Sequence, residues 1–197
     1  MVEDELIKIW QSSTKIEQVK FEKSRLILDM QSSLDRFHRQ IKFGILIEQI
    51  AALTIVPVFL FYIYWVPFVL SKLASFLIVI WAIWYMIRLR TLKKKRPKSI
   101  TLNYLDYLKE NQTYVSLLKN VTNTALYWYV LPPMTGYFLF IAGPYLDGII
   151  DFKFLIILTF IGLATVIATY FYSRWIVKKI YSPRLKKINE LIRVLEE

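Results

Sequence analysis

Residues Phe43–Trp65 read FGILIEQIAALTIVPVFLFYIYW, a run with one charged side chain, Glu48. At a rise of about 1.5 Å per residue, a helix over this run crosses a hydrocarbon core about 30 Å thick. The composition agrees, because 56% of the 197 residues are hydrophobic and 16% are aromatic. We therefore predict a membrane-spanning helix over residues 43–65.

Three further apolar runs predict three further spans. The second span follows a break at Val66-Pro67, and a short acidic segment separates the third span from the fourth. Connections this short make neighbouring helices antiparallel. The sequence thus predicts an all-α integral membrane protein with four transmembrane helices in two hairpins, over residues 43–87 (spans 43–65 and 68–87) and 126–175 (spans 126–146 and 154–175).

The third span contains prolines and glycines that would break a helix in water. Pro132, Pro133, Gly136 and Gly143 are tolerated in a membrane helix when neighbouring helices or side chains supply partners for the freed backbone groups. We expect a kink near the start of this span.

Basic residues indicate the orientation. Of the 26 lysines and arginines, 24 lie before the first span, between the second and third spans, or from Arg174 onward, whereas the two hairpin turns hold only Lys72 and Lys153. Because segments rich in lysine and arginine stay in the cytoplasm, we predict that both termini and the middle segment are cytoplasmic.

The three predicted cytoplasmic segments cover residues 1–42, 88–125 and 176–197, and each contains an amphipathic helical pattern. In the last segment, Leu185, Ile188, Ile192 and Leu195 have the spacing of a coiled-coil seam. About two heptads are too short to be stable alone. We therefore interpret these four residues as a candidate face for a partner helix.

Glu48 is the candidate polar site within the membrane, because an ionisable group in a span suggests a function by default. It lies close to Lys42, near the inner headgroup boundary. A structural pairing with Lys42 or with a base of the middle segment is the favoured interpretation, and a functional site is the alternative.

A basic run directly follows the second span: Lys93, Lys94, Lys95, Arg96 and Lys98 surround Pro97. Read alone, the run resembles a nucleic-acid patch. Its position after a membrane helix favours contact with anionic lipids of the inner leaflet, where each base contributes about 1 kcal/mol. We therefore expect membrane lipids, and no nucleic acid, as its partner.

The chain has no cysteine and one histidine, and we find no phosphate-binding loop, shared pair of carboxylates or serine nucleophile motif. The sequence therefore predicts no catalytic residues, no metal site, no cofactor and no enzymatic activity. An enzyme acting on lipid headgroups is a third interpretation without a motif behind it.

The stretch Trp128-Tyr129-Val130-Leu131-Pro132, with Gly136, Phe140 and Gly143, resembles a family of four-helix bacterial inner-membrane proteins of the Bacteroidetes type. The entry Phe37–Lys42 leading to Glu48 and Ala51-Ala52 is similar to the same family, as is the start Glu5–Gln11. This chain departs from the family pattern at Gly44, where members carry a base, and at Thr135, where a proline is usual.

Members of that family are often encoded beside extracytoplasmic-function sigma factors, and no activity is assigned to them. The resemblance implies a location in the bacterial inner membrane and a role as a membrane-tethered regulator or scaffold.

Together, these observations predict a non-enzymatic inner-membrane scaffold or regulator whose amphipathic helices engage a cytoplasmic protein, in signalling or anti-sigma-like regulation. The alternative is an accessory subunit of a larger membrane complex, or a small transporter-like bundle with a site shaped by Glu48 and the kinked third span. The sequence leaves homo-oligomerisation open.

Overall fold

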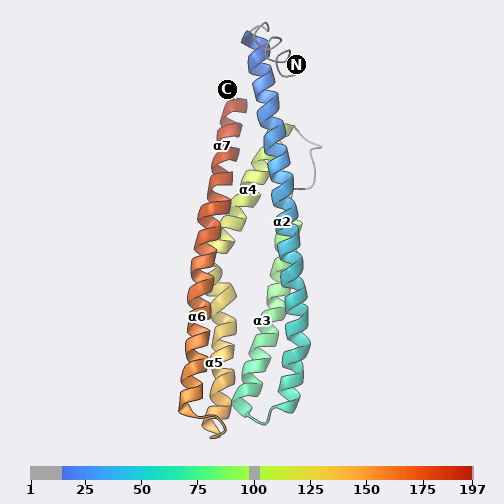
Figure 1. Ribbon diagram of the computed structural model, residues 1–197. Helices are drawn as coiled ribbons and strands as arrows, with labels where there is room; N and C mark the ends of the chain where they lie inside the picture. Colours follow the sequence, from blue (N-terminus) through green and yellow to red (C-terminus); the bar gives the residue numbers. More distant parts are fainter. Residues whose placement is uncertain (1–14, 98–102, 197) are drawn as a thin grey trace, which may run out of the picture. The chain divides into compact units, whose positions relative to one another are not determined.

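The computed structural model describes residues 15–97 and 103–196, with side chains from residue 24 onward, and it confirms the predicted all-α class. The described residues form helices and no strand. The elements are α2 (Lys15–Trp65), α3 (Val69–Lys94), α4 (Tyr104–Asn123), the π-helical turn η1 (Leu126–Val130), α5 (Leu131–Leu146), α6 (Phe152–Ile176), the π-helical turn η2 (Val177–Tyr181) and α7 (Ser182–Glu196) (Figure 1). The segment Glu5–Gln11 lies outside the described residues.

The chain divides into two compact units, residues 1–43 and residues 44–197. The boundary falls inside α2, which continues as one helix from Lys15 to Trp65. In the first unit, the described residues belong to this helix alone. The second unit contains the remainder of α2 and all the other elements.

Three helical stretches are long and apolar enough to cross a membrane: Ser24–Trp65, Val69–Lys94 and Phe152–Glu196. A fourth candidate joins Tyr104–Asn123 to Leu126–Leu146, two helices related by a bend of 57°. The chain therefore has three helices that could span a membrane, or four if the bent pair counts as one span. This number is compatible with a multi-pass membrane protein.

Large apolar side chains cover the surface of these helices. Leu53, Val69 and Phe160 are each more than 65% exposed, and they belong to three different candidate spans. A soluble protein rarely exposes apolar area on this scale, because water disfavours it. Lipid tails remove that cost, so the exposed apolar surface supports insertion into a bilayer.

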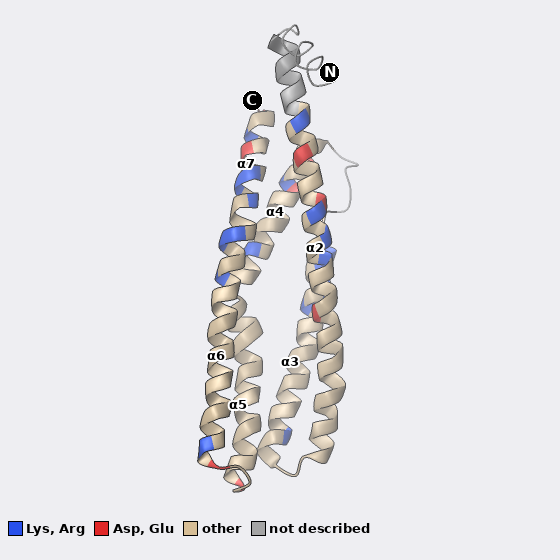
Figure 2. Cartoon of the chain, viewed as in Figure 1, with Lys and Arg blue, Asp and Glu red and all other residues tan. Residues whose placement is uncertain are grey.

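Charged side chains avoid the middle of the second unit (Figure 2). Helix α5 carries none, and those of α3 and α6 lie towards the helix ends. The segments 66–68 and 147–151 connect α2 to α3 and α5 to α6. Gly148 turns the second connection with a φ of +71°, a conformation that glycine adopts without strain. We call the end of the second unit with these two connections the turn end, and the opposite end the charged end.

Helix α3 packs closely and antiparallel against α5. A Cβ added to Gly136 would lie 2.6 Å from Cγ1 of Ile78, and one added to Gly143 would lie 3.2 Å from Cβ of Phe68. Ala74 and Ala82 are fully buried. Small residues at such positions let helix backbones approach, which favours association in lipid.

Two prolines of the third predicted span leave carbonyl groups without their usual helical donors, and α3 supplies the missing donors. Pro132 has no N–H for the carbonyl of Trp128, which accepts instead from Nε1 of Trp81 at 3.2 Å. Pro144 likewise frees the carbonyl of Phe140, which accepts from Oγ of Ser71 at 2.8 Å. The expectation that a neighbouring helix provides such a partner is confirmed at Pro132, and Pro144, which was not part of that expectation, has the same arrangement.

Each π-helical turn comes directly before a proline near the start of the next helix. Leu131 donates its N–H to Leu126, five residues back, just before Pro132. Ser182 does the same to Val177, just before Pro183. A proline ring clashes with the carbonyl four residues earlier in a regular helix, and the wider turn gives it room. Hence α6, η2 and α7 form one uninterrupted helical stretch.

Candidate functional site

Glu48 meets Tyr85 at the charged end of the predicted spans. At about 1.5 Å per residue, Glu48 lies about 26 Å along α2 from Trp65, and Tyr85 lies about 24 Å along α3 from Val69. Because a short connection joins these two helix ends, the residues have the same depth. The Tyr85 hydroxyl donates a hydrogen bond to the Glu48 carboxylate. The partner of Glu48 is thus a tyrosine rather than Lys42 or a base of the middle segment.

Around this hydrogen bond lies an aromatic cluster that we define as Trp81, Tyr85, Trp128 and Tyr129. The ring of Tyr85 stacks on that of Trp81, with centroids 5.3 Å apart and an interplanar angle of 4°. Its centroid is 5.2 Å from that of Tyr129 and 5.9 Å from that of Trp128. Only 4% of Tyr85 is exposed, and Ala52 of α2 packs in the same core.

Arg88 covers one edge of the aromatic cluster. Its guanidinium carbon lies 4.0 Å from the ring centroid of Trp128 and 5.2 Å from that of Trp84. A guanidinium over an indole face gains a cation–π attraction of about 0.5–2 kcal/mol. Nε1 of Trp128 donates to the carbonyl of Val121 at 3.1 Å, which fixes the ring under Arg88.

The chemistry of this site is hydrogen bonding and cation–π attraction between α2, α3 and η1. The site includes Trp128 and Tyr129, two of the residues on which the resemblance to the inner-membrane family rests. Over residues 24–97 and 103–196, whose side chains are described, no three histidine, aspartate or glutamate side chains are grouped so that they could hold a metal ion. The site joins helices at the charged end of the predicted spans.

The basic run lies at the end of α3. Lys93 and Lys94 belong to the last turn of α3, and Lys95 caps it. Lys94, Lys95, Arg96 and Pro97 line a cavity of about 780 Å³, whereas Lys98 lies outside the described residues.

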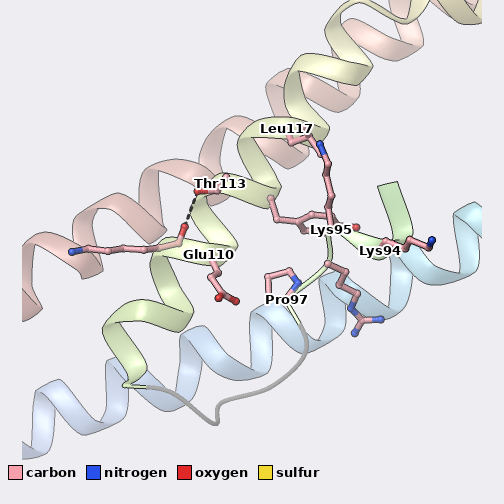
Figure 3. Close-up of a pocket in the computed structure, with 9 residues that line it drawn as sticks. Lys94, Lys95, Pro97, Glu110, Thr113 and Leu117 are labelled. Atoms are coloured by element: carbon pink, nitrogen blue, oxygen red, sulfur yellow. Dashed lines mark hydrogen bonds between the residues drawn. The ribbon is translucent and has the colours of Figure 1, made fainter. Parts of the chain in front are cut away.

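The opposite wall of the cavity is α4, through Lys109, Glu110, Thr113, Tyr114 and Leu117 (Figure 3). The Thr113 hydroxyl donates to the carbonyl of Lys109 at 3.0 Å. Burial raises the pKa of the Tyr114 hydroxyl, and the positive charge of Arg96 opposes that shift. Arg96 and Tyr114 both line the cavity.

The candidate partner-helix face of α7 is largely covered within the chain. Ile188 and Ile192 are buried, Leu185 and Leu195 are half-buried, and α7 packs along α4. Two polar contacts border the packing: Nζ of Lys109 lies 2.7 Å from Oε1 of Glu196, and Nε2 of Gln112 donates to Oδ1 of Asn189 at 2.9 Å. The coiled-coil spacing therefore corresponds to a pairing with α4.

Sequence reasoning missed Tyr85, Trp81 and Arg88 as parts of this site. Their spacing did hold a signal, because Trp81 and Tyr85, like Trp84 and Arg88, are four residues apart on one helix. Nothing in the sequence pairs them with Glu48 or Trp128, since that pairing depends on which helices are neighbours.

The fold and the site together define an all-helical protein with several helices able to span a membrane and an aromatic cluster at their charged end. No protein-family model matches the chain, and no curated protein or solved structure is significantly similar to it. The resemblance to the four-helix inner-membrane family therefore stays a prediction.

Proposed function

We propose that this protein is a non-enzymatic scaffold or regulator of the bacterial inner membrane, which engages a cytoplasmic protein through its helices at the charged end. The observation that carries the proposal is the continuous helical stretch Phe152–Glu196. Its first part is apolar, and its last part, α7, is charged and packs on α4. Because α7 continues the apolar helix α6 without a break, the charged surface of α7 is rigidly attached to a helix that can span the membrane.

The topology that goes with this function has four spans in two hairpins and both termini in the cytoplasm. The short connections 66–68 and 147–151 and the location of 24 of the 26 basic residues support it. In this arrangement, the charged end faces the cytoplasm and the turn end faces the opposite side. The amphipathic helices before the first span, in the middle segment and at the C-terminus would then all be available on one side of the membrane.

The surface of α7 that remains for a partner is polar. Lys186, Lys187 and Arg193 are exposed, and Glu190 is the exposed acid among them. Because the apolar face of α7 packs on α4, we propose that the partner contacts this polar face with an acidic surface. Charge complementarity would then set the partner choice and the association rate. A regulator that sequesters a cytoplasmic signalling protein, in the manner of an anti-sigma factor, fits this surface.

The second candidate is an accessory subunit of a larger membrane complex or a transporter-like bundle, and the carboxylate of Glu48 among aromatic rings favours it. The hydrogen bond from Tyr85 gives Glu48 a role in joining α2 to α3, for which no ligand is needed. We therefore place the scaffold first.

A photo-crosslinking experiment in native membranes tests the proposal. A photoreactive residue replaces the exposed Lys187 in one full-length variant and the buried Ile188 in another. We expect a defined protein adduct from position 187 and none from position 188. The adduct should disappear in a Lys186→Glu/Arg193→Glu background and persist in the matched Lys72→Glu/Lys153→Glu background.

An adduct that is insensitive to charge reversal on α7, or equal yields from the exposed and buried positions, would contradict a specific partner on this face. Absence of any adduct along the exposed face of α7 would also sink the scaffold proposal. Identification of the adduct by mass spectrometry then shows whether the captured surface is acidic.

A further inference from the structure

The cavity between the end of α3 and α4 has a chemistry that the scaffold function does not use. Lys94, Lys95 and Arg96 line it from the α3 side, and Glu110 is the acid that lines it. The ammonium of Lys109 pairs with Glu196 of α7, so Lys109 borders the cavity while its charge is engaged elsewhere. Three cations against one carboxylate leave the cavity suited to an anion.

The depth of the cavity relates it to the membrane. At about 1.5 Å per residue, α3 measures about 37 Å from Val69 to Lys94. The hydrocarbon core takes about 30 Å of this length, and each headgroup layer adds roughly 5–7 Å. If Val69 marks the edge of the core at the turn end, Lys94 and the following residues lie in the opposite headgroup layer, where lipid phosphates are found.

The size and the lining of the cavity narrow the ligand class further. A volume of about 780 Å³ lies within the range of roughly 300–1,000 Å³ that is typical of small-molecule sites, and a single inorganic ion would fill little of it. The half-buried Arg96 offers the planar donor fork that matches phosphate oxygens. Pro97 and Leu117 add apolar walls, which suit the glycerol and the first carbons of an acyl chain (Figure 3).

We propose that this cavity binds the phosphate headgroup of an anionic phospholipid of the cytoplasmic leaflet, with Lys95 and Arg96 as the main phosphate contacts. The lipid source rests on the topology proposed above, whereas the phosphate chemistry rests on the cavity alone. Helix α4 forms one wall of the cavity and packs against α7. A bound lipid would therefore link the C-terminal stretch of α3 to the α4–α7 pair. Lipid composition would thereby act on the same helices that we propose as the scaffold surface.

Native mass spectrometry of the full-length protein in detergent tests this site, with phosphatidylglycerol and phosphatidylcholine added in separate arms. We expect phosphatidylglycerol to be retained in preference to phosphatidylcholine. Each base beside an anionic surface contributes about a factor of five, so Lys95→Gln/Arg96→Gln should weaken retention about 25-fold. The matched variant Lys186→Gln/Lys187→Gln loses the same charge on α7 and should keep the parent affinity.

A second variant gives a change in the opposite direction and does not depend on a loss of binding. Glu110→Gln removes the acid from the cavity and should strengthen retention of phosphatidylglycerol about fivefold, by the same charge argument. Unchanged or weaker retention in Glu110→Gln would overturn the proposal. Circular dichroism and size-exclusion chromatography check that each variant folds.

Equal weakening in the α3 and α7 double variants would overturn a discrete site, because it would indicate diffuse attraction to anionic lipid. Displacement of phosphatidylglycerol by equimolar inorganic phosphate or glycerol 1-phosphate would overturn the lipid assignment in favour of a soluble phosphate compound. The α7 crosslink is measured separately, so failure of the lipid site and failure of the scaffold proposal give different results.

Discussion

The hydrogen bond from Ser71 to the carbonyl of Phe140 gives a sharp test of how α3 supports α5. Pro144 deprives this carbonyl of its helical donor, and Ser71 is fully buried, so water cannot replace the serine. Ser71→Ala removes the hydroxyl and leaves the carbonyl without a partner. We expect this substitution to destabilise the protein by more than an ordinary serine deletion does.

The magnitude follows from the two roles of the hydroxyl. Hydrogen bonds between membrane helices contribute about 0.6 kcal/mol on average, with values up to about 1.7 kcal/mol. A buried carbonyl left without any donor costs about 1–3 kcal/mol. We therefore expect Ser71→Ala to lower the free energy of unfolding by about 1.5 kcal/mol.

Ser75 provides a matched control on the same helix. It is also fully buried, but its hydroxyl donates to the carbonyl of Ser71, an acceptor that has its own helical donor. Ser75→Ala should therefore cost only about 0.5 kcal/mol, close to the average for such bonds. Reversible unfolding in mixed micelles of dodecylmaltoside and sodium dodecyl sulfate, followed by circular dichroism, measures both values.

A double-mutant cycle isolates the contribution of the proline. Pro144→Ala restores an N–H that can bond to the carbonyl of Phe140 within α5. In that background, Ser71→Ala should cost about 0.5 kcal/mol, which gives a coupling energy of about 1 kcal/mol between the two positions. Additive effects, with coupling below about 0.3 kcal/mol, would refute the idea that Ser71 compensates for Pro144.

Two further substitutions probe polar groups in the second unit. Tyr85→Phe removes the donor to Glu48 and should destabilise the protein by about 1–2 kcal/mol in the same unfolding assay; an equal cost in a Glu48→Ala background would contradict the pairing. Asn111 is fully buried, its amide nitrogen bonds to the carbonyl of Tyr107 and its Oδ1 has no partner, so Asn111→Leu should stabilise the protein by about 1 kcal/mol. A lower thermal midpoint for Asn111→Leu would show that the amide has a role that packing does not explain.

Helix ends in the apolar part of the chain could be predicted closely from the sequence. Helix α2 ends at Trp65 and α3 begins at Val69, on either side of the Val66-Pro67 break that marked the first turn. Proline disfavours helical geometry in the residue before it, which makes such a boundary readable from a local pattern. The predicted second span, by contrast, ends at residue 87, whereas α3 ends at Lys94. An apolar run shows how much of a helix lies in the membrane, and the helix can continue beyond that run.

Contacts between helices could not be predicted in the same way. Helix α7 begins at Ser182, directly before Pro183, yet the helical stretch runs through this point because η2 makes room for the proline ring. The seam around Ile188 was assigned to a partner, whereas α4 covers it. Periodicity identifies a face that must be buried, and it does not say which helix buries it.

The two π-helical turns also determine how this chain responds to changes in its length. Each π turn holds one residue more than a regular helical turn, and in a helix one residue corresponds to a rotation of about 100°. A one-residue deletion within Val177–Tyr181 that leaves a regular helical turn would therefore keep Ile188 on the side of α4, but it would remove the room that η2 gives to the ring of Pro183. A codon lost from the regular helix on either side of η2 would instead rotate everything that follows by about 100°, so the effect of a deletion in this part of the gene depends on where it falls.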